Sequence, residues 1–217
     1  MDEIIVRATR AMASYPRLRI LSLLAQGEQT PTRMAKTLQL PLCAISLHLR
    51  VLVNADLITR RKSGTWCYYR AESPYDATAF SGKLAQWLYA LLKTSSAGDS
   101  NHSGLLKVRN GSTGPGEESH RILFEAATAF TDLRRLQLLR HLGRQQNAGA
   151  QALEENLSMS PQAVTRHMGK LMRRGYVQAQ HLGRSVVYEP KRTAKTPVHR
   201  RLFEIIGSTW EGSFRTL

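Results

Sequence analysis

This 217-residue chain is poor in cysteine and acidic residues and has no long apolar run. Its two cysteines are too few for a disulfide framework or a four-cysteine zinc site. The longest apolar stretch, residues 45–53, is interrupted by His48 and Arg50, whereas a membrane-spanning helix needs about 20 apolar residues. Arg7 and Arg10 interrupt the first apolar stretch, which argues against a secretory leader. We therefore expect a cytoplasmic protein with no membrane partner.

Motifs of catalysis and cofactor binding are also missing from the sequence. It contains no phosphate-binding glycine loop, no nucleophile elbow, no paired catalytic carboxylates and no His-Glu-x-x-His motif. The seven histidines are scattered and no Cys-x-x-Cys pair accompanies them. We expect no enzyme, no cofactor and no metal site.

Basic residues, in contrast, are abundant and evenly distributed. The 31 Lys and Arg residues against 16 Asp and Glu residues give a formal net charge of +15. Residues 1–93 and residues 117–217 each carry a surplus of seven positive charges. A surplus of this kind is typical of proteins whose partner is a polyanion, either nucleic acid or an anionic surface.

The sequence repeats itself. Residues 41–69 match residues 160–188 at a constant offset of 119, in an ordered series that includes both His48 with His167 and Gly64 with Gly183. Upstream, an offset of 116 aligns Arg19 with Arg135, and so predicts three extra residues within 144–150. We interpret the series as a tandem duplication. It predicts one domain at 1–93, a flexible linker rich in Ser, Gly and Asn at 94–116, and a second domain at 117–217.

Hydrophobic periodicity and capping residues predict the same order of elements in both repeats: two helices, a third helix, a short turn, a fourth helix, a β-hairpin and a closing helix. The expected helices of the first repeat are 2–13, one beginning near Pro16, one beginning at Pro31, 41–54 and 75–93. Those of the second repeat are 117–130, 132–142, 149–156, 160–174 and 196–209. The predicted hairpins span 58–70 and 176–189. The predicted fold is mainly α with small β-hairpin wings, arranged as two tandem winged helix-turn-helix domains.

Three segments of the first repeat resemble the ArsR family of bacterial winged-helix repressors. They are Pro16–Leu21, Ile45–Leu49 and Arg60–Tyr69. The second repeat is similar mainly through Val164–Met168 and Gly183–Tyr188. The resemblance implies a transcription regulator that binds double-stranded DNA, and it implies a homodimer joined through first and last helices.

The two helices expected in the major groove, 41–54 and 160–174, carry the candidate base-reading residues. Hydroxyl, amide and guanidinium groups match the hydrogen-bonding edges of bases. The candidates that lie off the core stripes are Cys43, Ser46, Arg50, Gln162, Thr165, Arg166 and Lys170. The first helix is poorer in polar groups, and its leucines suit thymine methyl groups. We therefore hypothesise that the two repeats read different half-sites, the second with more hydrogen-bonded specificity.

The predicted wings add candidate contacts to phosphates or the minor groove. These candidates are Arg60, Arg61, Lys62, His181 and Arg184. A solvated strand face is the alternative for the first three. For His48 and His167 the family resemblance favours a DNA contact, and the alternative is a histidine bonded to nearby backbone. Cys43 and Cys67 are either small apolar fillers or redox-responsive groups in the DNA-binding region.

The leading prediction is a sequence-specific DNA-binding regulator, a repressor, with an unknown effector. Two assemblies are compatible with the sequence: a pseudo-dimer formed by the two repeats within one chain, and a homodimer of two chains. The alternative function is a tandem winged-helix scaffold for protein interactions, of the chromosome-segregation type, which needs no basic wing.

Overall fold

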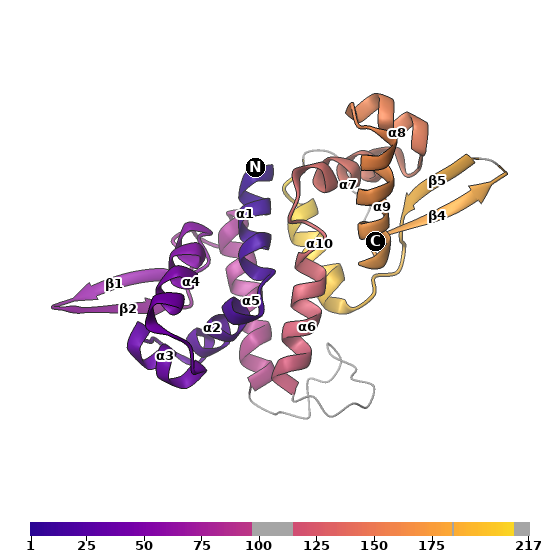
Figure 1. The fold of residues 1–217 in the computed structure, drawn as a ribbon. Helices are drawn as coiled ribbons and strands as arrows, with labels where there is room; N and C mark the ends of the chain where they lie inside the picture. Colours follow the sequence, from indigo (N-terminus) through magenta and orange to yellow (C-terminus); the bar gives the residue numbers. More distant parts are fainter. Residues whose placement is uncertain (97–114, 184, 211–217) are drawn as a thin grey trace. The chain divides into compact units, whose positions relative to one another are not determined.

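The computed structural model describes residues 1–96, 115–183 and 185–210 (Figure 1). It divides into two compact units. We call Arg7–Phe124 the first unit, and Met1–Val6 together with Glu125–Leu217 the second unit. The boundaries fall inside α1 (Asp2–Met12) and inside α6 (Pro115–Ala127). Most of the predicted linker and the predicted contact Arg184 lie outside the described residues.

Helices dominate the first unit, and their ends follow from local chemistry. It contains α2 (Tyr15–Gln26), α3 (Pro31–Leu38), α4 (Leu42–Asn54) and α5 (Phe80–Ser96). The Thr30 side chain accepts a hydrogen bond from the Arg33 N–H, and a proline at the first position of α3 needs no partner for its missing N–H. The hairpin pairs β1 (Thr59–Ser63) with β2 (Trp66–Arg70) and projects away from α3 and α4 (Figure 1).

The second unit has a similar order of elements, with one additional short strand. It contains α7 (Leu133–Gln145), β3 (Ala148–Gly149), α8 (Ala150–Leu157), α9 (Pro161–Arg173), β4 (Val177–Leu182), β5 (Ser185–Pro190) and α10 (Pro197–Gly207). Side chains of Asp132, Ser160 and Thr196 cap the starts of α7, α9 and α10. The three strands form one antiparallel sheet in the order β3-β5-β4.

Aromatic packing fills the core of the second unit. The ring of Phe130 meets the ring of Tyr176 edge-on, with centroids 4.8 Å apart, and Phe203 completes the cluster. Tyr176 is 1% exposed. Burial raises the pKa of its hydroxyl well above the ordinary value, because the charged form would lose its hydration.

Burial patterns correct the predicted upstream alignment. The buried residues of α2 are Leu18, Ile20, Leu21 and Leu24. Those of α7 include Leu136, Leu138, Leu139 and Leu142. These sets coincide at an offset of 118, so the predicted offset of 116 is wrong. Downstream the offset is 119, as in the isolated bridge of Gln29 with Tyr69 and the pairing of Ala148 with Tyr188. A single extra residue lies in the second unit, beside Gln146, which has a positive φ of 68°.

The closing helix of the first unit is shorter than predicted. It begins at Phe80 and not at Tyr75. The Asp76 carboxylate accepts hydrogen bonds from the Thr78 and Ala79 N–H groups, at 2.8 and 3.3 Å, and from the Thr78 hydroxyl. This local turn competes with helix formation until Phe80.

Candidate nucleic-acid interface

Helix α4 has one buried face and one exposed face. Ile45, Leu49 and Leu52 are each 0% exposed and fix the helix to the core of the first unit. The opposite face exposes Leu42, Cys43, Ser46, Leu47 and Arg50. The Ser46 hydroxyl donates to the Leu42 carbonyl at 2.9 Å, so its oxygen can still accept a hydrogen bond from outside.

A sharp turn presents this exposed face. Gln39 adopts the left-handed conformation, with φ 54°, directly after α3. The α3–α4 pair is bent by 115° at this break. Within the described ranges, no single helix reaches the length and apolarity of a membrane span, although this bent pair does so when its two helices are taken together.

Helix α9 repeats this arrangement with a more polar surface. Val164, Met168 and Leu171 are at most 1% exposed, and Ser158 makes the left-handed turn before the helix. The predicted residues Gln162, Thr165 and Arg166 are all exposed, and Lys170 is half-buried.

Lys170 lies close to several other positively charged side chains. Burial lowers the pKa of its ammonium group first, and the nearby guanidinium groups of Arg174, Arg135 and Arg173 lower it further. Arg173 and Arg174 were not among the predicted contacts, although both belong to the predicted helix 160–174. Their positions three and four residues after Lys170, which is helical spacing for one face, were the signal that could have identified them.

Neither of the two predicted histidines is fully exposed. His167 is 6% exposed, and its Nδ1 lies 3.9 Å from Asp132 Oδ1. Burial is the main cause of its lowered pKa. A direct DNA contact does not fit this placement, because the ring lies in the core. His48 is half-buried, and burial followed by the charge of Arg17 lowers its pKa.

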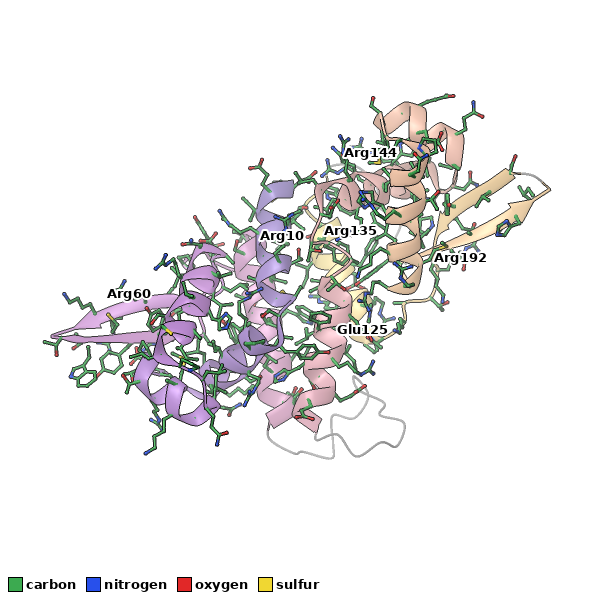
Figure 2. All side chains as sticks on the ribbon, in the orientation of Figure 1. Arg10, Arg60, Glu125, Arg135, Arg144 and Arg192 are labelled. Carbon is green, nitrogen blue, oxygen red and sulfur yellow. The ribbon has the colours of Figure 1, made fainter. Side chains whose placement is uncertain are left out.

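The first hairpin carries the three predicted basic residues on its exposed surface, and Figure 2 marks Arg60 on it. Arg60 Nη2 donates to Cys67 Sγ at 3.1 Å. Arg61 pairs with Glu28 at 3.1 Å, and its guanidinium lies 5.1 Å from the centre of the Tyr68 ring. The backbone of Lys62 pairs with Cys67, and its side chain makes no hydrogen bond or ion pair with any described residue. Arg70, also exposed on β2, was missed because it ends the strand and follows two tyrosines.

The second hairpin is less basic. His181 is exposed, as predicted for a surface contact. The side-chain amide groups of Gln178 and Gln180 donate to the Glu189 carboxylate, at 2.5 and 2.8 Å. Among the described side chains of this wing, amides and one carboxylate are bonded together, whereas the first wing carries exposed cations.

The two cysteines occupy different environments. Cys43 is exposed on α4 and Cys67 is half-buried on β2. Among the described residues there is no group of three or more His, Cys, Asp or Glu side chains placed to hold a metal ion.

Comparisons with known proteins find relatives for part of the chain. Residues 16–60 match the family model described as bacterial regulatory protein, arsR family. An HTH-type transcriptional regulator of Mycobacterium tuberculosis is 38% identical over 66 residues, which are 30% of this chain and 29% of that protein. The arsenical resistance operon repressor of Bacillus subtilis is 29% identical over 91 residues, 42% of this chain and 83% of that protein. The chain thus spans under a third of one relative and most of the other.

One solved structure is also similar. It is the homodimeric winged helix-turn-helix DNA-binding domain (fragment 1–100) of a possible ArsR-family transcriptional regulator from Mycobacterium bovis, at 28% identity. The match covers 50% of this chain and 89% of that chain, with a TM-score of 0.36. From the family match over α2, α3 and α4, residues 16–60 carry a helix-turn-helix domain of the arsR family of bacterial regulatory proteins.

Proposed function

We propose that this chain is a sequence-specific regulator of transcription that binds double-stranded DNA, and that it acts as a repressor. The observation that carries the proposal is the two-sided structure of α4, in which Ile45, Leu49 and Leu52 are fully buried while the other face is exposed, and a basic hairpin follows it in the same unit. A helix fixed in this way can enter the major groove without unpacking the core. The similarity to the arsenical resistance operon repressor favours repression.

We further propose that residues 117–217 form a second winged helix-turn-helix domain, produced by tandem duplication. Three kinds of correspondence support it: the order of helices and hairpin, the buried positions of α2 with α7 and of α4 with α9, and the left-handed turns at Gln39 and Ser158. Independent sequences have no reason to share all three.

The two repeats pair within one chain as a pseudo-dimer in this proposal. Within the first unit, Ser22 Oγ and His120 Nε2 are 2.7 Å apart, and the rings of Tyr15 and Phe124 stack at 4.8 Å. Within the second unit, the Asp2 carboxylate forms an ion pair with the Arg140 guanidinium. Each unit therefore contains residues of both repeats, which favours pairing inside the chain over pairing between two chains.

Light scattering on the purified protein, alone and with DNA, distinguishes the two assemblies. One chain per duplex supports the pseudo-dimer. Two chains per duplex support the homodimer and overturn this part of the proposal.

The central test measures the affinity of the full chain for DNA upstream of its own gene and for a shuffled duplex. The proposal expects tighter binding to the natural fragment, with affinity that falls steeply as salt rises because phosphate contacts release counterions. Weak binding to both duplexes at modest salt would contradict the proposal and favour the protein-interaction scaffold. A reporter driven by the same fragment tests the direction of regulation, since repression requires expression to rise when the gene is deleted.

A further inference from the structure

The two units carry their basic residues on different elements. In the first unit the hairpin segment 59–70 holds four basic residues, while the segment 42–54 of α4 holds one, Arg50. In the second unit α9 and its cap hold four, and the hairpin segment 178–189 holds one basic and one acidic residue. The four in the second unit are Arg166, Lys170, Arg173 and Arg174. The first unit therefore concentrates its cations on the hairpin, and the second concentrates them on the helix expected to read the bases.

The exchange is visible at matched positions of the hairpins. At the offset of 119, Arg61 corresponds to Gln180, and Arg70 corresponds to Glu189. In the second hairpin, the Gln180 side-chain amide donates a hydrogen bond to the Glu189 carboxylate. In the first hairpin, Glu28 lies 3.1 Å from Arg61 and 3.9 Å from Arg70. Arg60 and Lys62 have no acidic partner among the described residues, so at least two cations face solvent there.

Helices α4 and α9 differ in the opposite direction, since the exposed face of α9 is the more polar. The exposed face of α4 is largely apolar: Leu42 is 49% exposed, Leu47 57% and Val51 41%. At the offset of 119, Cys43 and Leu47 of α4 correspond to Gln162 and Arg166 of α9, which are polar and exposed. An amide and a guanidinium can form paired hydrogen bonds with adenine and guanine, whereas leucine contacts only the thymine methyl group.

Resting on the proposed function, we infer that the two units bind DNA by different chemistry, so that the operator is asymmetric. The second unit reads the sequence with α9, through hydrogen bonds from Gln162 and Arg166. The first unit holds the duplex mainly through phosphate contacts of its β1–β2 hairpin, and α4 adds a preference for thymine. The DNA partner is therefore a non-palindromic duplex with one strictly specified half-site and one loosely specified, A·T-tolerant half-site.

Selection of binding duplexes from a randomised pool by the full chain tests the inference directly. We expect one half of the selected sites to be strongly defined and the other to show only enrichment in A·T pairs. Two equally defined, inverted half-sites would overturn the inference while leaving the proposed function intact. Failure to enrich any sequence, with no binding to the natural upstream fragment, would overturn the proposed function as well.

Variants of the first hairpin test the phosphate contacts. The triple variant R60Q/R61Q/K62Q should bind the selected operator and a random duplex at least about tenfold more weakly at ~0.1 M salt, and by a similar factor for each. The logarithmic salt slope should fall by about 2 to 3, since each lost phosphate contact removes about 0.9. Arg144→Gln is the control, because it removes one exposed cation from α7, outside both hairpins, α4 and α9, and it should change neither quantity.

Variants of α9 test base reading. Gln162→Ala with Arg166→Ala should reduce the preference for operator over random duplex by about 10- to 100-fold, as expected when hydrogen bonds to one or two bases are lost. The matched pair on α4, Cys43→Ala with Leu47→Ala, should reduce that preference by no more than about threefold. Equal losses from both pairs would contradict the division of roles. All four side chains are exposed, and circular dichroism verifies that each variant is folded.

Discussion

Arg17 and Arg135 make equivalent hydrogen bonds in the two units. Arg17 Nε and Nη2 donate to the carbonyls of Ala11 and Arg10, both at 2.7 Å. Arg135 Nε and Nη2 donate to the carbonyls of Ala129 and Thr128, at 2.7 and 3.2 Å. Each guanidinium therefore ties the end of one helix to the start of the next, and satisfies carbonyls that have no partner in their own helix.

Removing either guanidinium should destabilise the protein. We expect Arg17→Met and Arg135→Met each to lower the free energy of unfolding by about 2 kcal/mol, because hydrogen bonds from a charged donor to carbonyls are lost while the carbonyls stay partly buried. Urea titration followed by circular dichroism measures the change. Arg144→Met is the control, since the Arg144 side chain is exposed (Figure 2) and should cost less than about 0.5 kcal/mol. If all three variants lose the same free energy of unfolding, the hydrogen bonds of Arg17 and Arg135 have no special structural role.

Truncation should be costly on the buried face of α4 and nearly neutral on its exposed face. Ile45→Ala should lower the free energy of unfolding by about 2 to 5 kcal/mol, because Ile45 is fully buried and its loss leaves a cavity. Leu47→Ala should change it by less than about 0.5 kcal/mol, since Leu47 is 57% exposed. Thermal or urea unfolding of the two variants provides the comparison. A large loss from Leu47→Ala would mean that this face is covered in the native protein.

Acid should destabilise the second unit through His199. This residue is 0% exposed; burial lowers its pKa to about 4, and nearby positive charge contributes further. A lowered folded-state pKa means that the unfolded chain takes up the proton first. Stability is then complete above about pH 6.5 and is lost as pH falls toward 4, by about 3 kcal/mol.

Urea midpoints measured from pH 7.5 to pH 4 test this dependence. His199→Gln, which keeps a polar side chain of similar size, should reduce the loss over that range. Some loss should remain, because burial also lowers the pKa values of His120 and His167 and acts in the same direction. If the urea midpoint of the variant falls with pH as much as that of the natural protein, His199 does not contribute to the loss of stability in acid.

Gly82 should tolerate no side chain. A Cβ at this position would lie 1.7 Å from the Asp76 carbonyl oxygen, which is backbone and cannot swing away. We expect Gly82→Ala to cost about 1 to 3 kcal/mol of unfolding free energy. Gly207→Ala is the contrasting control: nothing lies within 4 Å of a Cβ added at this last residue of α10, and alanine has a higher helix propensity than glycine, so the change should be neutral or stabilising. Differential scanning calorimetry of both variants measures the contrast.

Most helices and both hairpins were predictable because their signals are local. Thr30 before Pro31, Ser160 before Pro161 and the glycines at positions 64 and 183 mark ends and turns whatever the rest of the chain does. Strand β3 was missed because two residues, Ala148 and Gly149, carry no periodicity and pair only with β5, far along the chain.

The sequence predicted which residues of the candidate site are exposed, and it did not predict which are buried. Periodicity placed Gln162, Thr165 and Arg166 off the core stripe, and all three are exposed. His167 follows them directly, and its burial depends on contact with Asp132 on another segment, which no local pattern indicates. The upstream offset failed for a related reason: matching residue types favoured 116, whereas the hydrogen bonds of Arg17 and Arg135 establish 118.

The bridge between Gln29 and Tyr69 fixes the first hairpin to the start of α3. Two backbone hydrogen bonds join these residues, at 3.0 and 2.9 Å, one residue before the cap of α3. Tilting the wing relative to α3 would break both bonds. A pull on the tip of the hairpin is therefore transmitted to its root, and the Gln29 and Tyr69 amides should exchange with solvent together.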